Sequence, residues 1–160
     1  GSDLPNVADS HDVLDGRVRS EGHVIVIGGG LVGLEAAEYL CAKGCKVTIV
    51  EMLDEIGADL GDIRKVSVLG NIHGACIDVK TKTKVIEITG NAVRVEHEGQ
   101  TEDLACDYAV IAVGAKPRDG KDLEEACKRL GIDWYVIGDA LEARRAINAI
   151  YEANEVARAI

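Results

Sequence analysis

Residues 24–51 read VIVIGGGLVGLEAAEYLCAKGCKVTIVE, with three consecutive glycines between an apolar run and an alanine-rich segment. The run H-V-I-V-I at residues 23–27 predicts a short strand buried on both faces. The apolar spacing of residues 31–43 predicts a helix, and residues 46–50 predict a second buried strand. Because glycine is unfavourable in strands and helices alike, the glycine run must meet a requirement of the backbone.

The spacing of these glycines predicts what the backbone requirement is. Gly28, Gly30 and Gly33 fit the pattern G-x-G-x-x-G, directly after a strand and at the start of a helix. In that pattern the first glycine permits a tight turn, the second lets a pyrophosphate approach the backbone, and the third lets helix and sheet pack closely. The positive end of the helix then faces the phosphates. We therefore expect a dinucleotide-binding loop, with Leu31 and Val32 as further contacts.

An acidic residue follows at the place that such a loop requires. Glu51 ends the second predicted strand, 21 residues beyond Gly30. An acid there accepts hydrogen bonds from the adenosine ribose hydroxyls, and Met52 follows it as a further candidate contact. The alternative is that Glu51 is an ordinary solvated carboxylate at a strand end. Residues 51–63 contain no base, and Arg64 is the first candidate partner for a 2′-phosphate, so we expect NAD(H) rather than NADP(H).

The rest of the chain continues the alternation of strands and helices. Further strands are expected at residues 75–79, 85–88, 92–96, 108–113 and 134–137, the second and third of them forming a hairpin. Further helices are expected at residues 62–71, 121–130 and 144–160. This order predicts an α/β, Rossmann-like, three-layer fold with a central parallel sheet and a β-meander crossover.

The composition agrees with this fold and excludes some partners. The chain has 160 residues, of which 47% are hydrophobic but only 3% aromatic and none Phe, so the core must be aliphatic. The net charge of −10 makes binding to nucleic acid or to an anionic membrane a poor interpretation. No apolar run has the length of a membrane span, and we expect a cytoplasmic protein.

The cysteines and histidines indicate no metal site. The five cysteines have no C-x-x-C spacing, and we expect structural thiols in a reducing cytosol rather than a disulfide: Cys41, Cys45, Cys76, Cys106 and Cys127. The four histidines are scattered and show no ligand spacing: His11, His23, His73 and His97.

Four segments carry a resemblance to a known family: LPNVADSHDVLDGR (4–17), GGGLVGLE (28–35), IAVGAKP (111–117) and YVIGDALEARRAINAIYEANEVARAI (135–160). Over its whole length the chain resembles the C-terminal part of the flavin oxidoreductases of the 2,4-dienoyl-CoA reductase, enoate reductase and trimethylamine dehydrogenase group. The resemblance implies a parent enzyme with an FMN barrel and a four-iron cluster. It also implies a C-terminal module, similar to the pyridine-nucleotide disulfide reductases, in which an NAD(P)-binding domain interrupts an FAD-binding one.

The same resemblance implies roles for single residues. Glu35 would lie near the nicotinamide, Gly114 would allow close approach of the cofactor, and Gly138-Asp139 would hold the ribityl or pyrophosphate region of FAD. The alternatives are a first-turn acid favoured by the helix dipole for Glu35 and a helix-capping turn for Gly138-Asp139. The first FAD loop, the cluster cysteines and the C-x-x-x-x-C of disulfide reductases are not found in this chain.

These implications divide the chain into a connecting segment (1–20), an NAD(H)-binding domain (21–118) and a helix with the return segment of an incomplete FAD-binding domain (119–160). In the parent, hydride would pass from NADH to FAD, and electrons onward through the cluster to FMN and an enoate- or enoyl-type substrate. No residue here is expected to act as a catalytic acid or base, and the isolated chain is expected to be inactive. The alternatives are a parent that is an NADH oxidase or disulfide reductase, and a stand-alone nucleotide-binding or sensor module.

Overall fold

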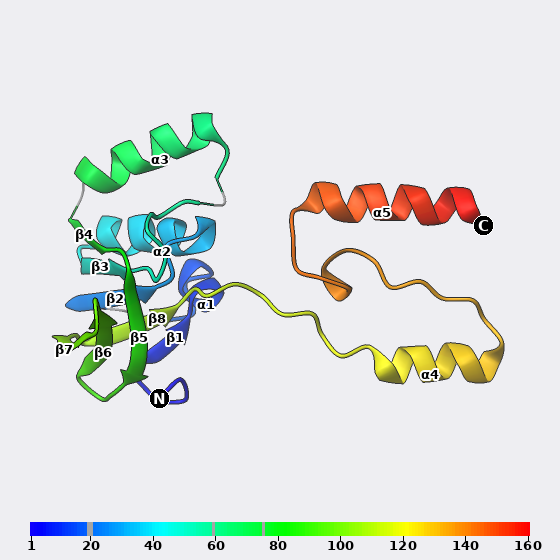
Figure 1. Cartoon of the computed structure of the whole chain (residues 1–160). Helices are drawn as coiled ribbons and strands as arrows, with labels where there is room; N and C mark the ends of the chain where they lie inside the picture. Colours follow the sequence, from blue (N-terminus) through cyan, green and yellow to red (C-terminus); the bar gives the residue numbers. More distant parts are fainter. Residues whose placement is uncertain (19–20, 59, 75) are drawn as a thin grey trace. The chain divides into compact units, whose positions relative to one another are not determined.

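A computed structural model describes residues 1–18, 21–58, 60–74 and 76–160, which divide into two compact units, Gly1–Val113 and Gly114–Ile160 (Figure 1). The centre of the first unit is a sheet in which every pairing is parallel. In spatial order its strands are β1 (Val7–Asp9), β8 (Tyr108–Ile111), β2 (His23–Ile27), β3 (Lys46–Val50) and β4 (Ile77–Lys80).

The strands with continuous apolar runs bury both of their faces. Side chains alternate across a strand, so Val24 and Val26 of β2 belong to one buried cluster while Ile25 and Ile27 belong to another. All four side chains are at most 8% exposed. The sheet therefore needs a cover on each side, and two different layers supply it.

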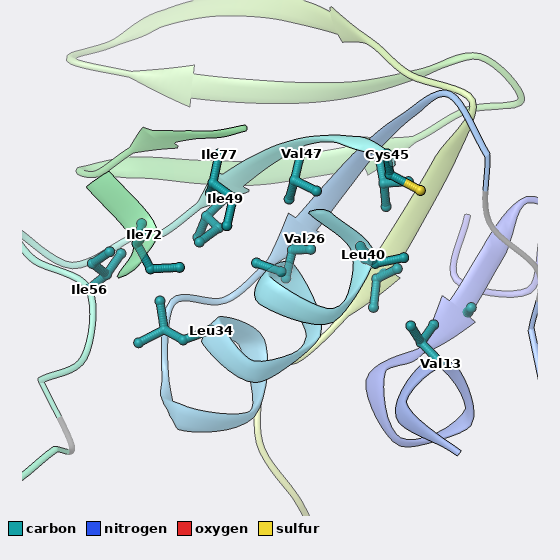
Figure 2. Packing of buried hydrophobic residues seen from close by; sticks show 14 residues of the cluster. Val13, Val26, Leu34, Leu40, Cys45, Val47, Ile49, Ile56, Ile72 and Ile77 are labelled. Atoms are coloured by element: carbon teal, nitrogen blue, oxygen red, sulfur yellow. The ribbon is translucent and has the colours of Figure 1, made fainter. Parts of the chain in front are cut away.

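Helices cover the first face of the sheet. Buried residues of α1 (Ser10–Leu14), α2 (Leu31–Ala42) and α3 (Asp62–Gly74) join the first cluster. Figure 2 shows Leu34 and Leu40 of α2 among the sheet residues Val26 and Ile49. The wide apolar face of α2 thus lies where its spacing predicts.

An antiparallel sheet covers the opposite face. Its strands are β5 (Thr83–Ile88), β6 (Ala92–His97) and β7 (Gln100–Ala105), in that spatial order. Inward residues of this meander, Ile88, Val93 and Val95, pack with Ile25 and Ile27 in the second cluster. The predicted three-layer α/β fold with a central parallel sheet and a β-meander is confirmed.

The second unit contains α4 (Lys121–Leu130), a short 3-10 helix η1 (Gly138–Ala140) and α5 (Ala146–Ala159). Neither α4 nor α5 contains a buried residue. α4 is capped by Gly131, which takes the left-handed φ of 66° that commonly ends a helix. No described helix in either unit combines the length and the apolar character that crossing a bilayer requires.

Several secondary-structure predictions need correction. Residues 1–20 contain β1 and α1, and the meander has a third strand, β7, which has too few apolar residues to show alternation. The strand predicted at 134–137 is wrong, because no described strand pairs with that stretch and a strand requires a hydrogen-bonded neighbour. The strand predicted at 75–79 is found at 77–80, and residue 75 lies outside the described residues.

The prediction that all five cysteines are free thiols is also wrong. Cys41, on α2, and Cys76, just before β4, form a disulfide with their Cα atoms 5.9 Å apart. Packing of α2 against the sheet brings the two residues together, which their separation of 35 positions did not indicate. Cys45 and Cys106 are buried thiols outside the disulfide, and burial raises the pKa of both.

Candidate dinucleotide-binding site

The glycine loop begins directly after β2. Gly28 adopts φ +106°, and a Cβ there would lie 2.5 Å from the carbonyl oxygen of Ala112. Both the backbone conformation and the space therefore require glycine. The Gly28 N–H donates to the Val50 carbonyl at 2.9 Å, which holds the loop against the end of β3.

The loop leads into the N-terminus of α2. Gly30 is the N-cap residue, with an extended backbone, and its carbonyl accepts the first helical hydrogen bond from the Leu34 N–H at 3.0 Å. A Cβ on Gly33 would collide with the carbonyl oxygen of Gly28, so this glycine lets the helix start close to the loop. Because Gly30 has no side chain to act as a cap, the positive end of α2 opens onto the loop without one.

Glu51 lies against this loop and is only 8% exposed. Its Oε2 accepts a hydrogen bond from the Gly29 N–H at 2.6 Å, and its Oε1 accepts one from the Leu53 N–H at 2.7 Å. The interpretation of Glu51 as an ordinary solvated strand-end carboxylate is therefore wrong. An ionised carboxylate offers about four acceptor positions, so the two N–H donors leave room for further hydroxyl donors.

The geometry fits the adenosine and pyrophosphate parts of a dinucleotide. The missing side chains of Gly28 and Gly33 let the loop, the helix and the end of β8 pack closely together, and the helix end supplies N–H groups and a favourable dipole for an anion. A carboxylate with remaining acceptor capacity stands beside the same loop, where ribose hydroxyls would donate to it. Among the described side chains, which do not include those of Asp59, Asp62 and His73, no group of three or more His, Cys, Asp or Glu residues could hold a metal ion.

The other candidate residues of the first unit lie around this loop. Leu31 and Val32 form the first turn of α2 and are half-buried, and Met52 is 67% exposed directly after Glu51. Glu35 is the fifth residue of α2, and the first turn contains no acid. The alternative that Glu35 is a first-turn acid is therefore wrong.

The remaining candidates, Gly114, Gly138 and Asp139, belong to the second unit. Gly114 has φ +91° with open space around a Cβ position, so only its backbone conformation favours glycine. Gly138 has φ +60°, and a Cβ there would lie 2.8 Å from the Cβ of Ala149. Oδ1 of Asp139 accepts a hydrogen bond at 3.2 Å from the N–H of Arg144, the residue before the N-cap of α5.

A glutamate that sequence reasoning did not identify holds the Gly138-Asp139 turn. Glu152 of α5 accepts a hydrogen bond from the Gly138 N–H at 2.7 Å, and its other oxygen pairs with the Arg144 guanidinium. The Gly138 N–H, followed by Arg144, lowers the pKa of Glu152 below its ordinary value. No motif marks Glu152, because its role depends on the turn being folded back onto α5.

The role of Gly29 in the loop was also missed. Gly29 was visible in the glycine run, yet only the structure shows that its N–H donates to Glu51 and that a Cβ there would meet Ile56 at 2.5 Å.

Two lysines that sequence reasoning did not identify reach the segment after Glu51, where the sequence lacks a base. Lys65 pairs with Glu55 at 2.8 Å, and Nζ of Lys82 lies 4.0 Å from Asp54.

The chain matches a family model and is similar to several known oxidoreductases. The family model described as "Pyridine nucleotide-disulphide oxidoreductase" matches residues 4–157. The chain is 37% identical over 159 residues to the bilirubin reductase of Mediterraneibacter gnavus (strain CC55_001C), covering 98% of this chain and 24% of that protein. It is 38% identical over 154 residues to the NADH oxidase of Thermoanaerobacter brockii, covering 94% of this chain and 24% of that protein.

A solved structure agrees with these matches. The 6-hydroxypseudooxynicotine amine oxidase of Pseudomonas geniculata N1 superposes with a TM-score of 0.85 and 28% identity, over 97% of this chain and 24% of that one. The chain thus spans about a quarter of the length of the curated relatives it matches.

Proposed function

The chain belongs to the pyridine nucleotide-disulphide oxidoreductase family, and we propose that it is the NAD(H)-binding part of a larger NADH-dependent flavin oxidoreductase. The relatives that it matches are oxidoreductases several times its length, and the family is one of pyridine-nucleotide and flavin enzymes. The activity of the whole enzyme then depends on domains that join this one.

The hydrogen bond between Gly29 and Glu51 is the observation that carries the proposal. A dinucleotide presents its pyrophosphate and its adenosine ribose close together, so the loop and the acid must be adjacent. Here a carboxylate that is 8% exposed accepts a 2.6 Å hydrogen bond from an N–H group of the loop itself. A structural glycine turn alone would not need a buried acid beside it.

The residues of this chain would bind and orient the cofactor. Gly28 and Gly33 permit the tight turn and the close packing of the helix, Gly30 lets the pyrophosphate approach the backbone, and Glu51 accepts hydrogen bonds from the ribose hydroxyls. Leu31, Val32 and Met52 add contacts, and Glu35 lies near the nicotinamide. Bound NADH supplies a hydride, and no residue of this chain acts as an acid or base.

The parent enzyme would use FAD as the first hydride acceptor. It would use a four-iron cluster and FMN for onward transfer to an enoate- or enoyl-type substrate. In this proposal residues 21–118 form the nucleotide domain, residues 1–20 lead into it, and residues 119–160 are the return segment of the FAD domain. Gly114, Gly138 and Asp139 would contact cofactor there, so the chain by itself lacks most of an FAD site and is inactive. We propose a cytoplasmic location for the parent.

The similarity to an NADH oxidase, at 38% identity, favours a second candidate for the parent. An NADH oxidase or disulfide reductase would keep the same NAD(H) domain and change only the acceptor. The two parents differ in the rest of their sequence, because only the first needs a barrel and cluster cysteines. A C-x-x-x-x-C helix or a lone active cysteine preceding this segment would favour the second.

An amide-resolved NMR titration of this chain with NADH and then with NADPH tests nucleotide binding directly. We expect shifts centred on residues 28–33 and on Glu51, stronger with NADH. Replacing Glu51 with Gln removes one charge and keeps the shape, and we expect it to weaken NADH binding by about tenfold, since one hydrogen bond to a charged group is worth roughly 1.5–3 kcal/mol. No shift in the loop at millimolar NADH would contradict the proposal.

A further inference from the structure

The turn between β4 and β5 is bonded to the segment that follows Glu51. The Glu51 N–H donates to the Lys80 carbonyl, the Thr83 N–H donates to the Glu51 carbonyl, and the Lys82 N–H donates to the Leu53 carbonyl, each at 2.9 Å. Lys82 takes a φ of 52°, a left-handed conformation that non-glycine residues seldom adopt. These contacts therefore fix Lys82 beside the ribose-binding acid, against the preference of its own backbone.

Two lysines reach the segment that follows Glu51, and each pairs with an acid of that segment. Lys82 has its Nζ 4.0 Å from Oδ1 of Asp54, and both side chains are more than half exposed. Lys65, on α3, has its Nζ 2.8 Å from Oε2 of Glu55, and its side chain is only 23% exposed. The sequence after Glu51 thus carries two acids, one paired with a lysine of α3 and the other with a lysine of the turn between β4 and β5.

We propose that Asp54 and Glu55 help to determine the nucleotide preference, by occupying the two lysines that would otherwise attract the 2′-phosphate of NADP(H). The inference rests on the proposed function and goes beyond Glu51 as the selective residue. A 2′-phosphate is attached to the ribose that Glu51 contacts, so it would enter the segment that carries these acids. It carries almost two negative charges at neutral pH, and Asp54 and Glu55 would both repel it and hold its counter-charges.

The fold brings two lysines to this segment, so NADP(H) is disfavoured by pairing these lysines with acids and not by a lack of cations. Lys65 reaches the segment after Glu51 from α3, and Lys82 reaches it from the turn between β4 and β5. Because the ion pairs are partly solvated, their ammonium groups would be accessible to a phosphate once the acids are neutralised. Selectivity of this kind depends on charge and must therefore depend on salt.

The test compares binding of NADH and NADPH to the wild-type chain and to the variant D54N/E55Q, by amide-resolved NMR at low and at physiological ionic strength. We expect NADPH affinity to rise about tenfold for each lysine released from its acid at low salt, and less at higher salt, from attraction between one ammonium and the 2′-phosphate at roughly 6 Å in a water-like dielectric. NADH affinity should change by less than about threefold, because no 2′-phosphate is present. Glu51 stays in place, so NADPH remains the weaker ligand.

Two further variants test whether the gain in NADPH affinity depends on these two acids and on the two lysines. E87Q/D103N removes the same number of charges and releases Arg94 from its ion pairs on the meander, and it should leave NADPH affinity almost unchanged. Adding K65A and K82A to D54N/E55Q should abolish most of the gain. If the gain survives loss of both lysines, or appears equally in E87Q/D103N, the acids do not act through Lys65 and Lys82.

The outcomes separate this inference from the proposed function. If the wild-type chain binds NADH and D54N/E55Q gains no affinity for NADPH, the inference is wrong and the NAD(H) domain stands. If the wild-type chain binds neither nucleotide, the proposed function fails and the inference fails with it. A wild-type chain that prefers NADPH would contradict the inference outright.

Discussion

The two units of this chain differ in how their apolar residues are covered. In the first unit, both faces of the parallel sheet are closed, and residues such as Ile25 and Leu34 are fully buried. In the second unit, α4 and α5 contain no buried residue, and Ile147, Ile150 and Tyr151 are each more than 60% exposed. An amphipathic pattern thus predicts a helix but does not provide the surface that covers it.

Hydrogen exchange should show the largest difference between the two units. We expect the amides of β2, β3 and β8 to exchange only through global unfolding, at a cost of about 5 kcal/mol or more. The amides of residues 134–160 should exchange through local opening, at least a thousandfold faster, because few apolar contacts hold them. Mass spectrometry or NMR of the chain measures both regions at once. Equal protection in the two units would show that α5 has cover that its exposed side chains do not indicate.

A matched pair of substitutions, one in each unit, should sharpen the comparison. Leu34→Ala removes a side chain that is fully buried between α2 and the sheet, and we expect it to lower the free energy of unfolding of the first unit by about 2–5 kcal/mol. Ile150→Ala removes a side chain that is 62% exposed, and we expect a change within about 0.5 kcal/mol. Urea unfolding followed by circular dichroism measures both. A loss of several kcal/mol for Ile150→Ala would contradict the contrast.

Acidification should have the smallest effect, and it should act on the second unit. Gly138 and then Arg144 lower the pKa of Glu152, so the charged carboxylate favours the folded turn. This stabilisation is fully present above the ordinary pKa of a glutamate, and it is lost as pH falls through the lowered pKa of the folded state. The amide signal of Gly138 should therefore titrate with a midpoint below the usual glutamate range.

The variant E152Q provides the control for that titration. Glutamine can still accept the Gly138 N–H but carries no titrating group, so the step in the Gly138 signal should disappear while the turn is retained. A step that persists in E152Q, or a midpoint at or above the ordinary glutamate value, would show that Glu152 does not hold this turn as described.

Most of the first unit was predictable from local patterns. The bounds of β2 and β3 agree with the predicted strands, and the positive φ of Gly28 agrees with the turn that the glycine spacing indicates. The family resemblance seen in the four quoted segments is confirmed by a family model that matches residues 4–157. These features were visible because each depends on residues that are near one another in the sequence.

The predictions that failed depend on partners that are distant in the sequence. The strand expected at 134–137 requires a neighbouring strand, and no described strand pairs with it. The cysteines were expected to be free, but Cys41 and Cys76 meet because α2 packs beside the start of β4. In both cases the local sequence is compatible with two outcomes, and the position of another element selects one.

The sequence by itself determined the strand, glycine loop, helix, strand and acid, and with them the expected class of ligand. Only the tertiary structure decided that Glu51 is bonded to the glycine loop through Gly29. It also decided that lysines pair with the two acids that follow Glu51, and that Glu152 holds the Gly138-Asp139 turn. The physical reason is the range of the interactions. Backbone conformation and amphipathic spacing are local properties, whereas a hydrogen bond or ion pair forms with whichever group the packing of the sheet and helices brings within about 3–4 Å.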